Sequence, residues 1–286
     1  MFTSHYLSAL RKKEYLNKIS IAHIFELSSQ EAHDYLMASE NYCTTELPEF
    51  IDFSPVLKCG EKIKDIDILD VATAAKRQED VNLCILSNKD GGFGVRPLTL
   101  ANPFLYAMMV KDMRKEENWL LILECFKKYN CENITACAIP QVKDSNRKEP
   151  FAKSTQILNW WSVMEQMSIE LFMDYRYMFM TDISNCIGEI NPQSIDWALS
   201  LKGTTDRTDD NHDIAQCLMY GLSAIQSEKN VGIPQESVLF SLIAGIVLRY
   251  SDRLLHEAIE KEGIEQDYLV LRYVDDDPIF LTIVAY

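Results

Sequence analysis

Two β-rich apolar runs near the end of the sequence enclose a group of acidic residues. The runs cover residues 269–274 and 278–281, and Asp275, Asp276 and Asp277 stand between them. Such a pattern predicts a β-hairpin that carries carboxylates at its tip. Because like charges at this spacing repel and raise each other's pKa, the tip should face a cation or open solvent. Mg²⁺ takes oxygen ligands and keeps waters and substrate phosphates, so we expect a further carboxylate from elsewhere in the chain.

A second apolar segment ends on a carboxylate. Residues 175–182 are rich in aromatic side chains and methionine, and the run ends at Asp182. The pattern predicts a strand with Asp182 at its end, which would supply the partner of the hairpin. Taken alone, an aspartate at this point also suits a turn or a helix cap.

The remaining pattern is mostly helical. Helix starts and apolar spacing predict helices after Ser28 and after Asn102-Pro103, and further helices within 119–126, 160–171, 194–199 and 238–262, the last ended by Gly263. Asp90-Gly91 between apolar runs predicts a second hairpin. Arg96 is the cation of its returning strand, so it suits either a phosphate contact or an exposed position.

Composition limits the possible classes of protein. The 286 residues are 47% hydrophobic and 25% charged, as in ordinary globular proteins. Eight cysteines without a C-x-x-C pair and five dispersed histidines argue for reduced thiols and against a zinc site. The formal charge of −15 counts against a nucleic-acid partner, since affinity for phosphates rests on Lys and Arg. The longest apolar run and the N-terminal residues predict a cytoplasmic protein without a membrane partner.

Three motifs in order resemble the palm of a reverse transcriptase. They are the strand ending at Asp182, the turn 232–235 (Gly-Ile-Pro-Gln) with its long helix, and the hairpin 273–276 (Tyr-Val-Asp-Asp). The likeness runs from about residue 90 to residue 280. The motifs at 96–98, 181–186, 194–199 and 271–273 most resemble the bacterial unknown-group and abortive-infection reverse transcriptases, which are implicated in defence against phage.

The resemblance implies an α+β fold with reverse-transcriptase-like fingers and palm, in which an antiparallel palm sheet is backed by helices and the thumb is missing. It divides the chain into an N-terminal helical extension (1–60), a fingers region with interleaved palm helices (61–160) and the palm with the three carboxylates (161–286). The implied activity is that of an RNA-directed or template-independent DNA polymerase, truncated from a longer antiphage defence protein or short by nature. Its partners would be deoxynucleoside triphosphates and an RNA or DNA template and primer, and homo-oligomers are compatible with it.

In this family the reaction is two-metal nucleotidyl transfer. By the resemblance, Asp182, Asp275 and Asp276 are the catalytic residues and hold two Mg²⁺ ions, or Mn²⁺, together with the backbone carbonyl of Ile183.

The nucleotide would be bound by residues from other motifs. By the resemblance, Arg96 contacts the triphosphate, Gln235 lies beside the sugar and Ile187 stands where family members usually carry an aromatic residue.

The sequence also departs from the family pattern. Glu236 replaces a glycine after the Gly-Ile-Pro-Gln turn, Asp277-Pro278 replaces Tyr-Arg after the paired aspartates, and the given sequence ends soon after the hairpin. These departures favour an alternative, a catalytically silent palm–fingers fragment that acts as a protein-interaction module.

Overall fold

The computed structural model describes most of the chain. The described residues are 22–45, 47–48, 50–62, 66–75, 77–78, 81–89, 94–136, 140–142, 153–200, 214–226, 232–235, 237–263 and 268–282. The chain forms two compact units from interleaved segments. Unit 1 comprises Met1–Glu26, Tyr129–Cys186 and Leu248–Tyr286, and unit 2 comprises Leu27–Lys128 and Ile187–Val247. The structure is mixed α and β with small sheets, and its division into fingers and palm at residues 60 and 160 stays a prediction.

Unit 1 is built on a four-stranded sheet with the order β4-β7-β8-β6. Its strands are β4 (Ile134–Ala136), β6 (Tyr177–Asp182), β7 (Tyr268–Arg272) and β8 (Asp276–Leu281). β7 and β8 pair antiparallel, as the hairpin prediction required, and β6 pairs antiparallel with β8. β4 pairs parallel with β7, so the sheet is mixed rather than antiparallel throughout. The expectation of an antiparallel sheet was wrong at this strand. β4 and β7 are far apart in sequence, and a long connection permits parallel pairing.

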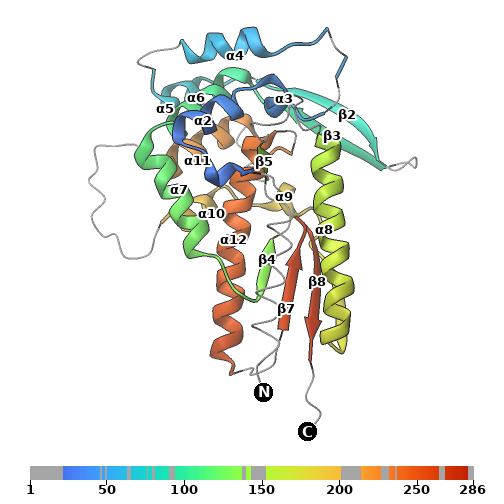
Figure 1. The fold of residues 1–286 in the computed structure, drawn as a ribbon. Helices are drawn as coiled ribbons and strands as arrows, with labels where there is room; N and C mark the ends of the chain where they lie inside the picture. The colour runs from blue at the N-terminus through green and yellow to red at the C-terminus, as the bar shows by residue number, and fades with distance from the viewer. Residues whose placement is uncertain are drawn as a thin grey trace. The chain divides into compact units, whose positions relative to one another are not determined.

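Helices cover the two faces of this sheet in unit 1. On one face α8 (Lys153–Asp174) packs Met164, Met167 and Leu171 against Leu269, Leu271 and Phe280. On the other face Ile259 of α12 (Val238–Lys261) packs against Ile134, Tyr268 and Val270. Alternate residues of β7 therefore face opposite helices, as the two-residue period of a strand requires. Figure 1 shows β7 and β8 as red arrows beside α8.

Short elements complete unit 1. β1 (Ala22–His23) pairs with β5 (Gln141–Val142), and the 3₁₀ helix η1 (Ile24–Glu26) follows β1. α9 (Cys186–Glu189) begins at the last residue of the middle segment of this unit.

Unit 2 is mainly helical. Its helices are α2 (Ser29–Leu36), α3 (Ser39–Tyr42), α4 (Ser54–Glu61), α5 (Ile68–Ala75), α6 (Pro103–Met113), α7 (Glu116–Lys128), α10 (Gln193–Leu199), α11 (Ile214–Ile225) and the first part of α12. Tyr106 of α6 lies at the centre of its core, where its hydroxyl donates to the carbonyl of Leu36 at 2.7 Å. Its ring packs edge-on against the rings of Tyr42 and Phe240, a favourable geometry for aromatic pairs.

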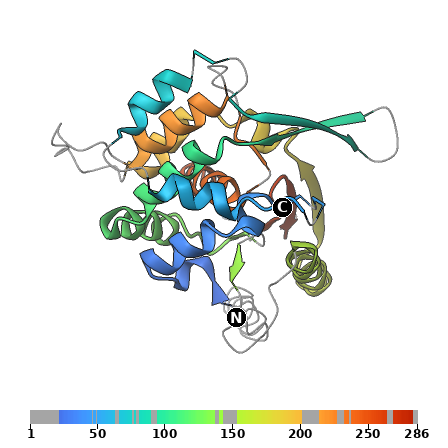
Figure 2. The ribbon, with the colours of Figure 1, turned by 90° about the horizontal axis from the view of Figure 1, so that it is seen from above.

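The predicted second hairpin is present in unit 2. β2 (Leu83–Lys89) and β3 (Gly94–Leu100) pair antiparallel with Leu83 opposite Leu100. Figure 2 shows the pair as a long two-stranded ribbon that extends from the helices of its unit. The Asp90-Gly91 turn itself lies outside the described residues.

Local signals at helix ends are confirmed. Ser28 caps α2 in a reciprocal capping box with Glu31. Asn102 caps α6 by accepting from the backbone N–H groups of Phe104 and Leu105. Gly263 has a φ of +65° directly beyond α12, as expected for a helix-ending glycine. Among the described helices, none combines the length and apolar character needed to cross a membrane.

Candidate active site

The sheet of unit 1 brings two of the predicted carboxylates together. In the β6–β8 register Asp182 lies directly opposite Asp276. Directly opposed residues of an antiparallel pair point to the same face, with their Cβ atoms about 4.5–5.5 Å apart. Asp182 is exposed and Asp276 is partly buried, so the pair is open to solvent on one side.

The third carboxylate belongs to the turn that joins β7 to β8. Tyr273 and Asp276 close this turn with two reciprocal backbone hydrogen bonds of 2.9 and 3.0 Å. The carbonyl of Asp275 accepts a further hydrogen bond from the backbone N–H of Ile183 at 2.9 Å. The turn is therefore attached to the end of β6, next to Asp182.

The turn contains a strained residue. Val274 has a φ of +60°. A β-branched residue rarely adopts this left-handed region, and such strain costs on the order of 1–3 kcal/mol. The surrounding hydrogen bonds must hold the turn against this strain.

The electrostatics of the site are those of excess negative charge. Burial, and then the charges of Asp275 and Asp182, raise the pKa of Asp276. The pKa of Tyr273 is also raised, by burial first and then by Asp275 and Asp276. Within the described part of the chain, none of the three carboxylates forms a salt bridge. The site would therefore be stabilised by a cation.

The donor set can be compared with what Mg²⁺ requires. Three carboxylates and a backbone carbonyl are hard oxygen ligands, the type that Mg²⁺ prefers. The carbonyl of Ile183 accepts from the N–H of Cys186 at 3.1 Å, which leaves one of its two lone pairs for a further partner. In the conformations of the described residues, no three His, Cys, Asp or Glu side chains converge closely enough to hold a metal ion. The case for a Mg²⁺ site therefore rests on two observations: the donor atoms are hard oxygens, and the β6–β8 register sets Asp182 opposite Asp276.

Sequence reasoning missed a buried ion cluster on the opposite face of the sheet. Arg272 lies 2.5 Å from Asp252 of α12 (Nη2 to Oδ1) and 3.2 Å from Asp277 of β8 (Nη1 to Oδ2). A signal existed, because every residue of β7 is buried and an arginine in such a strand needs an acidic partner. Asp252 carried no comparable signal, since it is a single acid in a long helix.

The predicted nucleotide-binding residues belong to unit 2. Arg96 lies on β3 opposite Ser87, and its side chain is outside the described part of the structure. The backbone N–H of Ile233 donates to the carbonyl of Ile187 at 2.9 Å, so the turn 232–235 is attached to α9. Gln235 is exposed at the end of this turn. Glu236, the departure noted from the sequence, lies outside the described residues.

Gly232 explains why this turn needs a glycine. Its φ is +83°, and a Cβ at this position would lie 2.4 Å from the carbonyl oxygen of Gly188. The backbone N–H of Gly232 donates to the carbonyl of Ile190 at 3.1 Å. The close approach of two backbone segments therefore excludes a side chain here.

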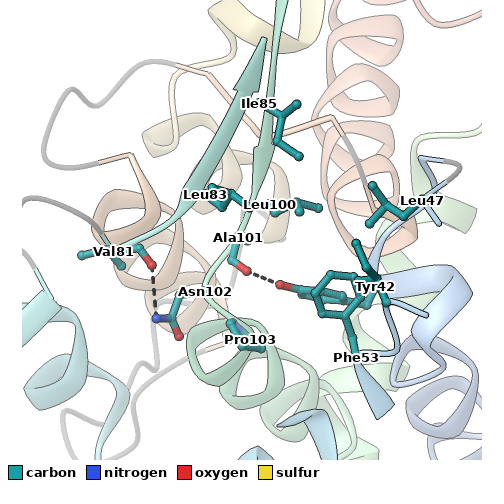
Figure 3. A pocket seen from close by; sticks show the side chains of 11 residues that line it. Tyr42, Leu47, Phe53, Val81, Leu83, Ile85, Leu100, Ala101, Asn102 and Pro103 are labelled. Carbon is teal, nitrogen blue, oxygen red and sulfur yellow. Dashed lines mark hydrogen bonds between the residues drawn. The ribbon is translucent and has the colours of Figure 1, made fainter. Parts of the chain in front are cut away.

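Unit 2 also contains an apolar cavity of about 260 Å³. It is lined by Tyr42, Leu47, Ile51, Phe53, Val81, Leu83, Ile85, Leu100, Ala101, Asn102 and Pro103. As Figure 3 shows, its polar groups already have internal partners: the Tyr42 hydroxyl donates to the carbonyl of Ala101, and the Asn102 amide donates to the carbonyl of Val81. The cavity thus offers apolar surface rather than groups for catalysis.

No protein-family model matches the sequence, and no curated protein matches it significantly.

Proposed function

We propose that this chain is a nucleotidyltransferase of the reverse-transcriptase type, an RNA-directed or template-independent DNA polymerase of a bacterial antiphage defence system. The observation that carries the proposal is the register that sets Asp182 opposite Asp276, beside a turn attached through Asp275. Like charges directly opposite each other in a sheet destabilise it, so an arrangement of this kind suits a cation site.

The proposed roles follow from the chemistry of the residues. Asp182, Asp275, Asp276 and the carbonyl of Ile183 would hold two Mg²⁺ ions. Bound magnesium would activate the primer 3′-hydroxyl and neutralise charge on the leaving pyrophosphate. The three carboxylates would set the position of the reacting groups, and phosphoryl transfer depends mainly on such positioning and charge neutralisation.

The roles proposed in nucleotide recognition rest on the resemblance. Under this proposal Arg96 contacts the triphosphate, because a guanidinium forms bidentate bonds with phosphate oxygens. Gln235 and Ile187 line the position of the sugar. An aliphatic residue at 187 would reject ribonucleotides less strictly than the aromatic residue usual in the family.

The proposal is tested by incorporation of labelled deoxynucleotides. The chain is incubated with Mg²⁺ or Mn²⁺ and each nucleotide, with a primed RNA, with a primed DNA and without a template. We expect a labelled product that Asp182→Asn abolishes. Glu262→Gln, which replaces an exposed acid directly after α12, should leave the product unchanged. Absence of a product under all three conditions, together with a melting temperature indifferent to metal and nucleotide, would reject the activity.

A second candidate function, a catalytically silent interaction module, is favoured by the surface of β6. Among the described strands β6 pairs with β8 alone, and it exposes Tyr177, Phe179 and Met180, with Phe179 51% exposed. Exposed strand edges are templates for pairing with another chain. If this is the function, Phe179→Lys should abolish self-association measured by light scattering, while Asp182→Asn should leave it unchanged. A monomeric wild-type chain would count against this candidate.

A further inference from the structure

Arg272 and Asp277 flank the turn that carries Asp275. Arg272 is the last residue of β7 and Asp277 is the second residue of β8, so the two enclose the four turn residues. Their side chains meet at 3.2 Å, and Asp252 approaches the same guanidinium at 2.5 Å from α12. The exposed fractions are 6% for Arg272, 6% for Asp277 and 1% for Asp252. These three residues, the Arg272 cluster, form a buried bridge between the two strands and the helix.

The Arg272 cluster is under-satisfied. Two buried carboxylates contact one guanidinium, and burial raises the pKa of both Asp277 and Asp252 against the lowering effect of Arg272, to which Arg249 adds a smaller lowering effect at Asp252. In the described structure Asp277 Oδ1, Asp252 Oδ2 and Arg272 Nε have no hydrogen-bond partner. A hydrophobic cluster would fill this space at lower cost, so the ions are not explained by stability alone.

The geometry connects the cluster to the carboxylate pair. Successive residues of a strand point to opposite faces, so a bond that holds Asp277 on the α12 face also holds Asp276 on the α8 face. Asp276 then lies opposite Asp182. A slip of one residue would reverse both side chains. The cluster also closes the base of the turn that contains Val274, whose φ is +60°.

We propose that Arg272 is a positioning residue, which, clamped between Asp252 and Asp277, holds the turn so that Asp275 and Asp276 face Asp182. Its catalytic significance rests on the nucleotidyl transfer proposed above. Arg272 itself touches neither substrate nor metal in this role and acts through the backbone of the turn.

The test replaces the whole cluster with apolar residues, in the variant Asp252→Leu/Arg272→Met/Asp277→Val. Such replacements of buried ion clusters commonly preserve the fold. Amide hydrogen exchange is measured in metal-free protein at Tyr273, Asp276 and Ile183, whose N–H groups form the hydrogen bonds of the turn. We expect protection at these three amides to fall at least tenfold. The amide of Val270, bonded to the carbonyl of Asn133 at 2.8 Å, should stay as protected as in the wild type.

Two further variants control the experiment. Asp252→Asn removes one charge and keeps the Arg272–Asp277 contact, so it should give a smaller loss of protection at the same amides even if the triple variant fails to fold. Arg253→Met removes an ion pair with Glu257 from the neighbouring position of α12, outside the Arg272 cluster, and should leave protection at the three turn amides unchanged.

Protection at the turn that equals wild type in folded Asp252→Asn and in the triple variant would overturn the positioning role. The positioning role would also be overturned if both variants lost protection uniformly, at Val270 as well as at the turn amides, because such a loss would show that the cluster only stabilises the fold.

Metal affinity separates this inference from the proposed function. Mn²⁺ binding to the wild type is measured by electron paramagnetic resonance, and the triple variant should bind at least tenfold more weakly. A wild type that binds no Mn²⁺ would refute the proposed function, whereas the exchange data would still decide the role of Arg272. Equal Mn²⁺ affinity in the wild type and the triple variant would refute the positioning role alone.

Discussion

Replacing Asp276 with asparagine should stabilise the metal-free protein and destabilise it relative to wild type when metal and nucleotide are present. The carboxylate of Asp276 stands opposite Asp182 and next to Asp275, and both charges contribute to its raised pKa. A group whose folded pKa is raised contributes stability at low pH, and this contribution is lost as the pH rises through the folded pKa. At neutral pH the ionised Asp276 therefore opposes folding, and asparagine removes the repulsion while keeping the shape.

The magnitude follows from the spacing of the opposed residues. Two unit charges about 5 Å apart repel by about 0.8 kcal/mol in water and by about 3 kcal/mol at an effective dielectric constant of about 20. Because Asp182 is exposed, the lower figure applies. With Asp275 as a second neighbour we expect a gain of about 1 kcal/mol, which corresponds to a rise of about 2–4 °C in Tm for a chain of this size.

Metal and nucleotide should reverse this order of stability, so that the wild type becomes more stable than the Asp276→Asn variant. Ligand at a hundred times its Kd stabilises a folded protein by about 2.7 kcal/mol, and the variant loses one of the three carboxylates that would bind it. Thermal unfolding is measured in EDTA and in Mn²⁺ with a deoxynucleoside triphosphate, with Glu262→Gln as the control for loss of an exposed acid. The advantage of the variant in EDTA should vanish below about pH 4, the ordinary pKa of an aspartate, where Asp276 with its raised pKa is protonated in the folded protein. The reasoning would be refuted if the variant were less stable than the wild type in EDTA and gained as much stability from Mn²⁺ and nucleotide as the wild type does.

Two other predictions concern the buried cluster and the glycine turn. Burial raises the pKa of Asp277 to about 6, so the free energy of unfolding should fall as the pH rises from about 4 to about 6, and Asp277→Asn should remove this part of the slope in urea titrations. An unchanged slope would contradict the assignment. Gly232→Ala should cost more stability than Gly263→Ala, since a Cβ at 232 meets a carbonyl oxygen at 2.4 Å whereas none of the described atoms lies within 4 Å at 263. Gly263→Ala should cost about 1–2 kcal/mol in urea unfolding, and equal losses for both variants would refute the steric argument.

Local features of the fold could be predicted from the sequence because their causes are local. The hairpin of β7 and β8 follows from two apolar runs around a polar turn, and the ends of α2, α6 and α12 follow from Ser28, Asn102 and Gly263. Each signal acts within a few residues of the structure it determines.

The pairing of distant segments could not be predicted in the same way. The sequence left Asp182 either at a strand end or in a turn, and the opposed position of Asp276 is set by a register between strands almost a hundred residues apart. The parallel pairing of β4 with β7 has the same origin. Patterns of alternating residues show which face of a strand is buried but not which strand lies beside it.

The extra carboxylate of Asp277 illustrates what the structure adds to a sequence motif. In the sequence it is the third of three consecutive acids, a pattern that predicts increased repulsion at the turn. In the structure its side chain lies on the opposite face of the sheet, where Arg272 contacts it at 3.2 Å, although the charges of Asp276 and Asp275 still add to the raised pKa of Asp277. The alternation of a β-strand thus gives one of the three acids a cationic partner on the other face of the sheet. An aspartate at 277 is therefore compatible with a cation site at 275 and 276, provided that an arginine ends the preceding strand.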